Sequence, residues 1–126
     1  MNTSRNIGAS MQILEEIVTR IVEHFDPQGL ILFGSHARGE AREDSDFDLL
    51  IIAPSNEPRW RRTVPVYRLL AGLGVPKDII WWTPEEIAEW RDVKSHLIHR
   101  ALQEGEVLYG ETPDSRRHPP LQLHKP

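Results

Sequence analysis

The stretch LILFGSHARGEAREDSDFDLLII, residues 30–52, constrains the fold more than any other part of the chain. Two apolar runs with strand character flank a polar middle, which contains the pair Gly34-Ser35 and two aspartates one residue apart, Asp46 and Asp48. Residues i and i+2 of a strand lie on the same face, so the two carboxylates are expected to project together. Like charges at that separation repel, and burial costs each of them solvation. The sequence therefore predicts a positively charged ligand at this place.

Two adjacent carboxylates suit a hard cation such as Mg²⁺, because it prefers oxygen ligands and its charge cancels their repulsion. A third acid is the expected complement. Asp78, in the apolar run VPKDIIWW, is the candidate, since a strand at this point would otherwise favour an apolar residue. Three acids can share two metal ions, as in phosphoryl-type transfer, where such a pair activates a hydroxyl and stabilises the leaving group. The alternative is that Asp78 is a turn residue paired with Lys77.

Gly34-Ser35 predicts a phosphate site beside the predicted metal site. A glycine at a strand end lets the backbone approach a ligand closely. A helix that follows it offers N–H groups and a positive dipole end, which suit phosphate oxygens. The Ser35 hydroxyl can donate to a phosphate, and Arg38 carries a fixed charge one turn further on, although it could equally be a plain surface arginine. His36 is expected to be structural or solvent-facing. Metal site and phosphate site together indicate a nucleoside triphosphate site.

Length and composition limit the architecture to one compact domain. The chain has 126 residues, 39% of them hydrophobic and 27% charged, which is typical of a soluble globular protein. It contains no cysteine, which favours a reducing cytoplasm, and neither a membrane span nor a signal peptide is recognisable. The net charge of −4 argues against a large nucleic-acid surface.

Periodicity and turn signals predict strands that alternate with helices, hence an α/β or α+β class with helices packed on a small mixed sheet. Strands are expected at 30–33, 47–52, 75–82 and, as an edge strand, 107–109. Helices are expected at 11–25 with Ser10 as the cap, 37–41, 61–73 with a start or bend near Thr63 because of Pro65, 84–92 and 95–103. A domain over 1–110 would precede a Pro-rich, flexible or docking tail over 111–126, which holds four of the ten prolines.

Two aromatic and basic clusters have structural interpretations as well as functional ones. Three arginines surround Trp60 (Arg59, Arg61 and Arg62), and they are expected to form a solvated helix start. The functional alternative is contact with an acidic partner or with nucleotide phosphates. Trp81 and Trp82 are expected on opposite faces of their strand and mainly in core packing, although the one on the acidic face could flank an adenine.

The segment GSHARGEAREDSDFDLLII resembles the signature of the polymerase-beta-type nucleotidyltransferase superfamily. It has the Gly-Ser turn, an Arg-Gly, and then Asp-x-Asp entering a hydrophobic strand. The third acid of that family falls on a later strand, where Asp78 stands. With no second domain, the chain is similar to the minimal nucleotidyltransferases of prokaryotes, from about residue 14 to 109, and IHRALQEGEVLYG is similar to their closing helix and strand. The paired tryptophans after the third acid are bulkier than the family's aliphatic residues.

The resemblance implies a nucleotidyltransferase fold and an enzyme that moves AMP from ATP onto a hydroxyl and releases pyrophosphate. It implies two Mg²⁺ ions, with Asp46 and Asp48 holding both. Asp78 would hold one of them and help to deprotonate the incoming hydroxyl. The residues expected to bind the triphosphate are Gly34 and Ser35, with Arg38 assisting.

The resemblance also implies a partner protein. Many members of the group are antitoxins that adenylylate a tyrosine of an all-helical HEPN toxin, and such a toxin, encoded nearby, is the expected partner of this chain. The alternative is a non-catalytic binding module that neutralises a HEPN partner by complex formation, with tryptophans and the tail as its contact surface. A small-molecule acceptor, as in aminoglycoside nucleotidyltransferases, is disfavoured because the chain lacks room for the extra helical segments of those enzymes.

Overall fold

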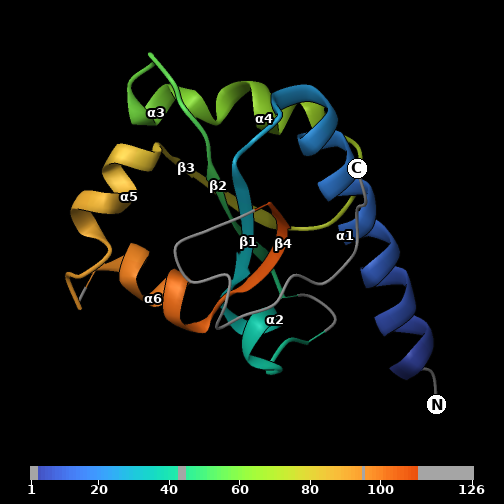
Figure 1. The fold of residues 1–126 in the computed structure, drawn as a ribbon. Coiled ribbons are helices and arrows are strands. Elements are labelled where there is room, and N and C mark those ends of the chain that lie inside the picture. The colour runs from blue at the N-terminus through green and yellow to red at the C-terminus, as the bar shows by residue number, and fades with distance from the viewer. Residues whose placement is uncertain (1–2, 43–44, 95, 111–126) are drawn as a thin grey trace.

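The computed structural model describes residues 3–42, 45–94 and 96–110 (Figure 1). The elements in chain order are α1 (Thr3–Phe25), β1 (Gly29–Phe33), α2 (Ser35–Arg38), β2 (Phe47–Ile52), α3 (Arg59–Arg62), α4 (Val64–Leu69), β3 (Lys77–Trp82), α5 (Pro84–Trp90), α6 (Leu97–Glu104) and β4 (Glu106–Gly110). The four strands form one sheet in the order β3-β2-β1-β4. β1 is antiparallel to both β2 and β4, whereas β3 runs parallel to β2. The predicted class, a small mixed sheet with helices packed on it, is confirmed.

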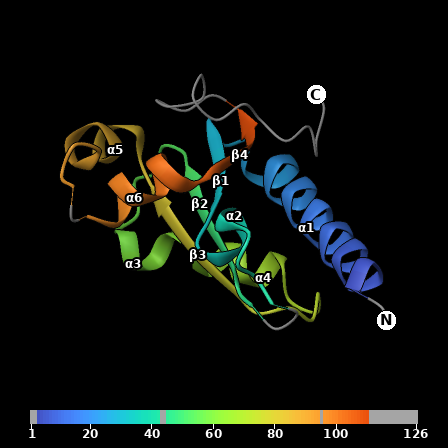
Figure 2. The ribbon, with the colours of Figure 1, turned by 90° about the horizontal axis from the view of Figure 1, so that it is seen from below.

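Helices cover both faces of the sheet. One face packs on α1 and α4 through a core that includes Leu14, Ile17, Leu49 and Val66. The other face packs on α5 and α6 and buries Leu50, Ile52, Trp82, Ile87 and Ile98. Figure 2 shows the sheet between α1 on one side and α5 and α6 on the other. Burial on both faces explains why the central strands are continuous apolar runs rather than alternating patterns.

Several predicted element boundaries differ from the observed ones. α1 begins at Thr3 rather than after Ser10, so the prediction of Ser10 as an N-cap was wrong. No proline precedes Met11, and the turns before it therefore continue the same helix. The helix expected at 61–73 is divided at Thr63 into α3 and α4, with Pro65 in the first turn of α4. β4 lies at the edge of the sheet, as predicted, and the predicted tail at 111–126 lies outside the described residues.

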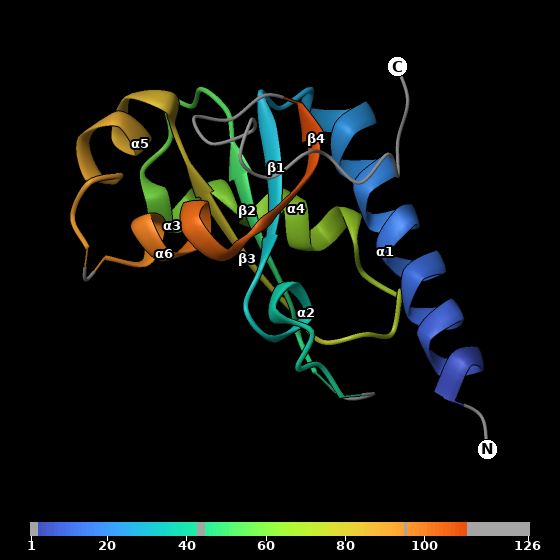
Figure 3. The ribbon, with the colours of Figure 1, turned by 60° about the horizontal axis from the view of Figure 1, so that its bottom comes forward.

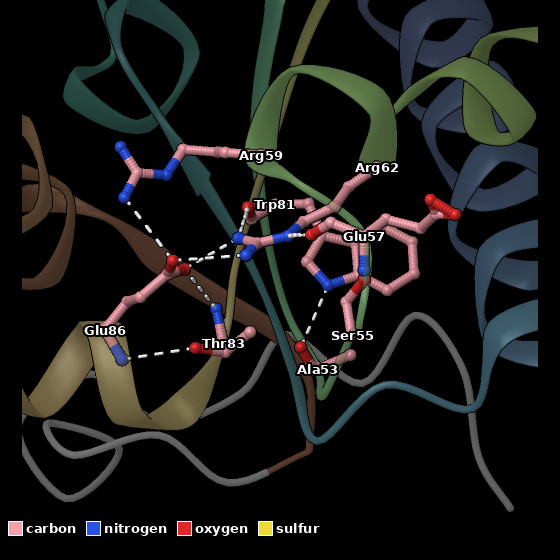
Figure 4. A network of polar contacts seen from close by, with 8 residues as sticks. All are labelled: Ala53, Ser55, Glu57, Arg59, Arg62, Trp81, Thr83 and Glu86. Carbon is pink, nitrogen blue, oxygen red and sulfur yellow. Dashed lines mark hydrogen bonds and ion pairs between the residues drawn. The ribbon is translucent and has the colours of Figure 1, made fainter.

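A largely buried ion pair joins α3 to α5, and no pattern in the sequence predicted it. The Arg62 side chain is only 7% exposed and donates to Glu86 at 2.7 Å, to the Trp81 carbonyl at 3.2 Å and to the Glu57 carbonyl at 2.9 Å (Figure 4). Glu86 also closes a capping box with Thr83 at the start of α5. Arg62 is therefore not part of a solvated basic helix start, and that expectation was wrong for this residue.

Both consecutive tryptophans of β3 are buried. Trp81 is 8% exposed and belongs to the core under α1 and α4, while Trp82 is 6% exposed and belongs to the core under α5 and α6. The Arg59 guanidinium lies 3.8 Å from the centre of a Trp82 ring. Core packing, the favoured interpretation, is confirmed for both residues. In the part of the chain that the structure describes, no helix is long and apolar enough to cross a membrane.

Candidate active site

The candidate residues lie where β1 ends and where β2 and β3 begin. Phe33, the last residue of β1, pairs with Asp48 in β2, and Asp48 is in turn the partner of Asp78 in β3. Asp48 and Asp78 therefore lie side by side on neighbouring parallel strands. Asp46 lies one residue before the start of β2. Figure 3 shows α2 beyond this end of the sheet.

Gly34 brings the backbone directly against the Asp48 carboxylate. Its φ of 76° lies in the left-handed region that favours glycine. A Cβ at position 34 would overlap Oδ2 of Asp48 and lie only 3.0 Å from its Cγ. Residue 34 must therefore be glycine for two independent reasons, a positive φ and the close approach of the neighbouring carboxylate.

The Asp48 carboxyl group has a raised pKa, because the groups that oppose its ionisation outweigh those that favour it. Burial raises the pKa of its carboxyl group, and the nearby negative charges of Asp78 and Asp46 raise that pKa further. His36 and Arg38 lower it, but by less. No arginine, lysine or histidine of the described residues is within ion-pair distance of Asp48. A cation bound at this carboxylate would lower its pKa and so oppose the effects of burial and of the neighbouring acids.

The three candidate acids do not converge on one point in the arrangement described. Asp48 is half-buried, whereas Asp46 and Asp78 are exposed. Across residues 3–42, 45–94 and 96–110, no three histidine, cysteine or acidic side chains stand close enough to hold an ion in common. The charges of Asp46 and Asp78 nevertheless act on Asp48, so all three acids belong to the same local field. The alternative partner of Asp78, the Lys77 ammonium group, donates instead to the Val75 carbonyl at 2.7 Å.

A cavity of about 340 Å³ opens beside Asp48. Its lining consists of Phe33, Gly34, Ser35, Arg38, Asp48, Leu97, Arg100 and Glu104. All three predicted phosphate-binding residues, Gly34, Ser35 and Arg38, thus line one cavity together with the central acid. The Arg38 guanidinium is engaged by two carboxylates, with Nε 2.9 Å from Glu40 and Nη1 3.6 Å from Glu104.

His36 fixes the loop that carries Asp46. Its ring stacks on Phe47 with 4.3 Å between ring centres, and its Nε2 lies 3.2 Å from the Ser45 carbonyl oxygen. These contacts join the single turn of α2 to the residues on either side of Asp46. The expected structural role of His36 agrees with this arrangement.

The residues that α6 contributes to the cavity (Leu97, Arg100 and Glu104) were not identified as site residues in the sequence. α6 is far from the Gly-Ser and Asp-x-Asp motifs along the chain, and charged residues on an amphipathic helix are ordinarily solvated. The signal available was the similarity of IHRALQEGEVLYG to the closing segment of minimal nucleotidyltransferases.

The glycine turn after β1, the Asp48 carboxylate and the cavity thus lie together at one end of a mixed sheet. The family of nucleotidyltransferase domains matches residues 14–103, so this chain belongs to that family. The match spans both candidate motifs, Asp78 and the part of α6 that lines the cavity up to residue 103.

Solved structures with the same fold include nucleotidyltransferases and toxin–antitoxin proteins. A protein from Sulfolobus solfataricus assigned as a nucleotidyltransferase is 19% identical, with a TM-score of 0.55 over 84% of this chain and 87% of that one. A toxin–antitoxin with AMP-PNP is 20% identical, with a TM-score of 0.52 over 82% and 78% of the two chains. A variant of the toxin–antitoxin MntA–HpeT is 18% identical, with a TM-score of 0.54 over 81% and 77%. No curated protein matches the chain.

Proposed function

We propose that this chain transfers AMP from ATP to a tyrosine hydroxyl of a HEPN toxin and thereby acts as its antitoxin. One observation carries the enzymatic part of the proposal: the Gly34 backbone lies against a half-buried carboxylate, Asp48, and both residues line the same cavity. A site built only for stability would not place three acids in one field without a cation. Membership of the nucleotidyltransferase family supports the reaction class.

The acidic residues fit a divalent metal site. Asp48 is the central ligand in this proposal, and the exposed side chains of Asp46 and Asp78 can change rotamer toward it. Bound Mg²⁺, in two ions, would supply charge neutralisation on the phosphates and lower the pKa of the acceptor hydroxyl. Burial and the nearby negative charges of Asp78 and Asp46 raise the pKa of Asp48, and a divalent cation would offset both effects.

The chain's own groups would position the substrate and take up the proton. Gly34 allows the triphosphate to approach the backbone, and the Ser35 hydroxyl donates to a phosphate oxygen. The acceptor hydroxyl oxygen attacks the α-phosphorus of ATP, the bond to the β-phosphate oxygen breaks, and pyrophosphate leaves. Asp78 accepts the hydroxyl proton and then releases it to solvent.

The toxin partner is supported by the similarity in fold to MntA–HpeT and to the toxin–antitoxin with AMP-PNP. A second candidate function, neutralisation by binding alone, is supported by an apolar stripe on α3 and α4. Trp60 in α3 is 75% exposed, and Val64 and Tyr67 in the adjoining α4 are each 40% exposed. Such a stripe is typical of a protein-binding surface.

A cell-survival experiment separates these two functions. The double variant Asp46→Asn/Asp48→Asn would be expressed with an all-helical HEPN toxin encoded beside this chain's gene. If protection depends on nucleotidyl transfer, the double variant should fold and form the complex but should no longer protect the cells. Full protection by the folded double variant would contradict the enzymatic proposal and establish neutralisation by binding. Trp60→Ser is the matched variant, since it should weaken the complex and leave the acidic site intact.

A further inference from the structure

The cavity beside Asp48 has a second wall that comes entirely from α6. Leu97, Arg100 and Glu104 lie at positions i, i+3 and i+7, so they share one face of the helix and line the cavity together. An adjacent face of α6 carries Ile98, Ala101 and Leu102, all buried in the core. The amphipathic pattern of α6 thus fixes which residues the helix presents to the cavity.

Arginine supplies both cations of the cavity lining, and the two arginines differ in their partners. The Arg38 guanidinium lies 2.9 Å from Glu40 and 3.6 Å from Glu104, and the hydrogen bond that it donates to Glu40 raises its pKa. The Arg100 guanidinium has neither a hydrogen bond nor an ion pair to any residue that the structure describes. Of the two, Arg100 is the cation with its donors open to a ligand.

The backbone of α6 is held firmly at both ends, so the base of the Arg100 side chain is well positioned. His96 caps the helix by accepting the Ile98 N–H at 3.1 Å, and its ring stacks on Trp90 with 4.7 Å between ring centres. At the other end, a Cβ on Gly105 would overlap the Ala101 carbonyl and the Ile31 side chain. Helix α6 therefore cannot shift on the sheet without breaking close contacts.

We propose that Arg100 binds the phosphate oxygens of the nucleotide across the cavity from Gly34-Ser35, so that α6 closes the triphosphate site. A planar guanidinium makes bidentate, charge-assisted hydrogen bonds to phosphate. Asp48 lines the same cavity, so a polyphosphate beside this carboxylate needs nearby cations to offset the repulsion. Arg38 differs in that its ion pair with Glu104 connects α2 to α6. This inference rests on the proposed nucleotide site.

Calorimetric titration of the full chain with Mg·ATP and with Mg·tripolyphosphate tests the assignment. Arg100→Gln should weaken binding of both probes by about tenfold or more, because a charge-assisted contact to the shared phosphates is lost. Arg100→Lys should retain part of the affinity. Arg68→Gln, a change of another exposed arginine remote from the cavity, is the matched control and should bind both probes as the wild type does.

The outcomes separate this inference from the proposed function. If the wild type and Arg100→Gln bind both probes with equal affinity, the role of Arg100 is overturned, but the proposal of a nucleotide site is not. Weaker binding of ATP with unchanged binding of tripolyphosphate also overturns it, because the contact would then be to the nucleoside. If the wild type binds neither probe, both the nucleotide site and the role of Arg100 fall. The melting temperature of Arg100→Gln without ligand should equal that of the wild type, which excludes loss of folding as the cause.

Discussion

At the scale of single residues, the contact between Gly34 and Asp48 joins the two motifs into one site. Gly34 contributes a backbone conformation and Asp48 contributes a charge, and the two residues are in direct contact. Residue 34 has no room for a side chain because the Asp48 carboxylate lies against it. The same contact covers part of the carboxylate and contributes to its desolvation.

Replacement of Gly34 by alanine should abolish nucleotide binding. The new methyl group would overlap Oδ2 of Asp48 and push that carboxylate out of the site, in addition to about 1 kcal/mol of strain from the positive φ. Gly74→Ala is the matched control, because its φ is 77° but its surroundings are open. The measurement is the affinity for Mg·ATP. Normal affinity in a folded Gly34→Ala protein would contradict the close approach described here.

Removal of the Asp48 charge should stabilise the metal-free protein. The pKa of Asp48 is raised above its ordinary value of 3.8, so ionisation above the folded-state pKa costs stability, and below 3.8 the carboxyl is neutral in both states. Asp48→Asn should therefore melt at a higher temperature than the wild type at pH 7 in a chelator, and the difference should shrink as the pH is lowered through the acid range.

The same substitution, Asp48→Asn, should lower the rate of nucleotidyl transfer by about 10²-fold or more, as expected for loss of a principal electrostatic group. Asp92→Asn, at a carboxylate that is 95% exposed, should leave both stability and transfer unchanged.

The stability prediction would be contradicted if metal-free Asp48→Asn melted below the wild type at pH 7. Such a result would mean that the ionised Asp48 carboxylate stabilises the fold.

At the scale of elements, the ion pair between α3 and α5 separates stability from function. Arg62 and Glu86 lie at the end of β3 that is away from Asp78, next to Trp81 and Thr83 (Figure 4). The hydrogen bond from Arg62 lowers the pKa of Glu86 from 4.5 to about 2, although partial burial opposes the shift. The pair therefore contributes stability that is complete above pH 4.5 and is lost as the pH falls toward 2.

Glu86→Gln should destabilise the fold by about 3 kcal/mol, because it leaves the buried Arg62 guanidinium without its carboxylate. It should also remove the part of the acid destabilisation that lies between pH 4.5 and 2. Glu85→Gln, in the same first turn of α5 but exposed, is the control. Chemical unfolding at several pH values measures both effects. If the unfolding free energies of Glu86→Gln and Glu85→Gln fall equally as the pH is lowered, the pH dependence comes from groups other than Glu86.

At the scale of the whole molecule, the sequence predicted local patterns better than long-range ones. The apolar runs at 30–33 and 47–52, the helix start at residue 84 and the edge strand expected at 107–109 depend on nearby residues, and they agree with the structure. Burial of Arg62 and the α6 wall of the cavity depend on which elements meet in space, and no short-range signal encodes that. The assignment of Asp46, Asp48 and Asp78 as metal ligands stays a prediction.

The proposal that this chain adds AMP to a HEPN partner at Asp48 can be tested on the partner itself. The measurement is the intact mass of the purified HEPN protein after incubation with this chain, ATP and Mg²⁺. We expect a gain of one or more AMP units, lost with Asp48→Asn and kept with Asp92→Asn. An unchanged mass in a complex that forms normally would contradict it, since the partner would then be neutralised by contact alone.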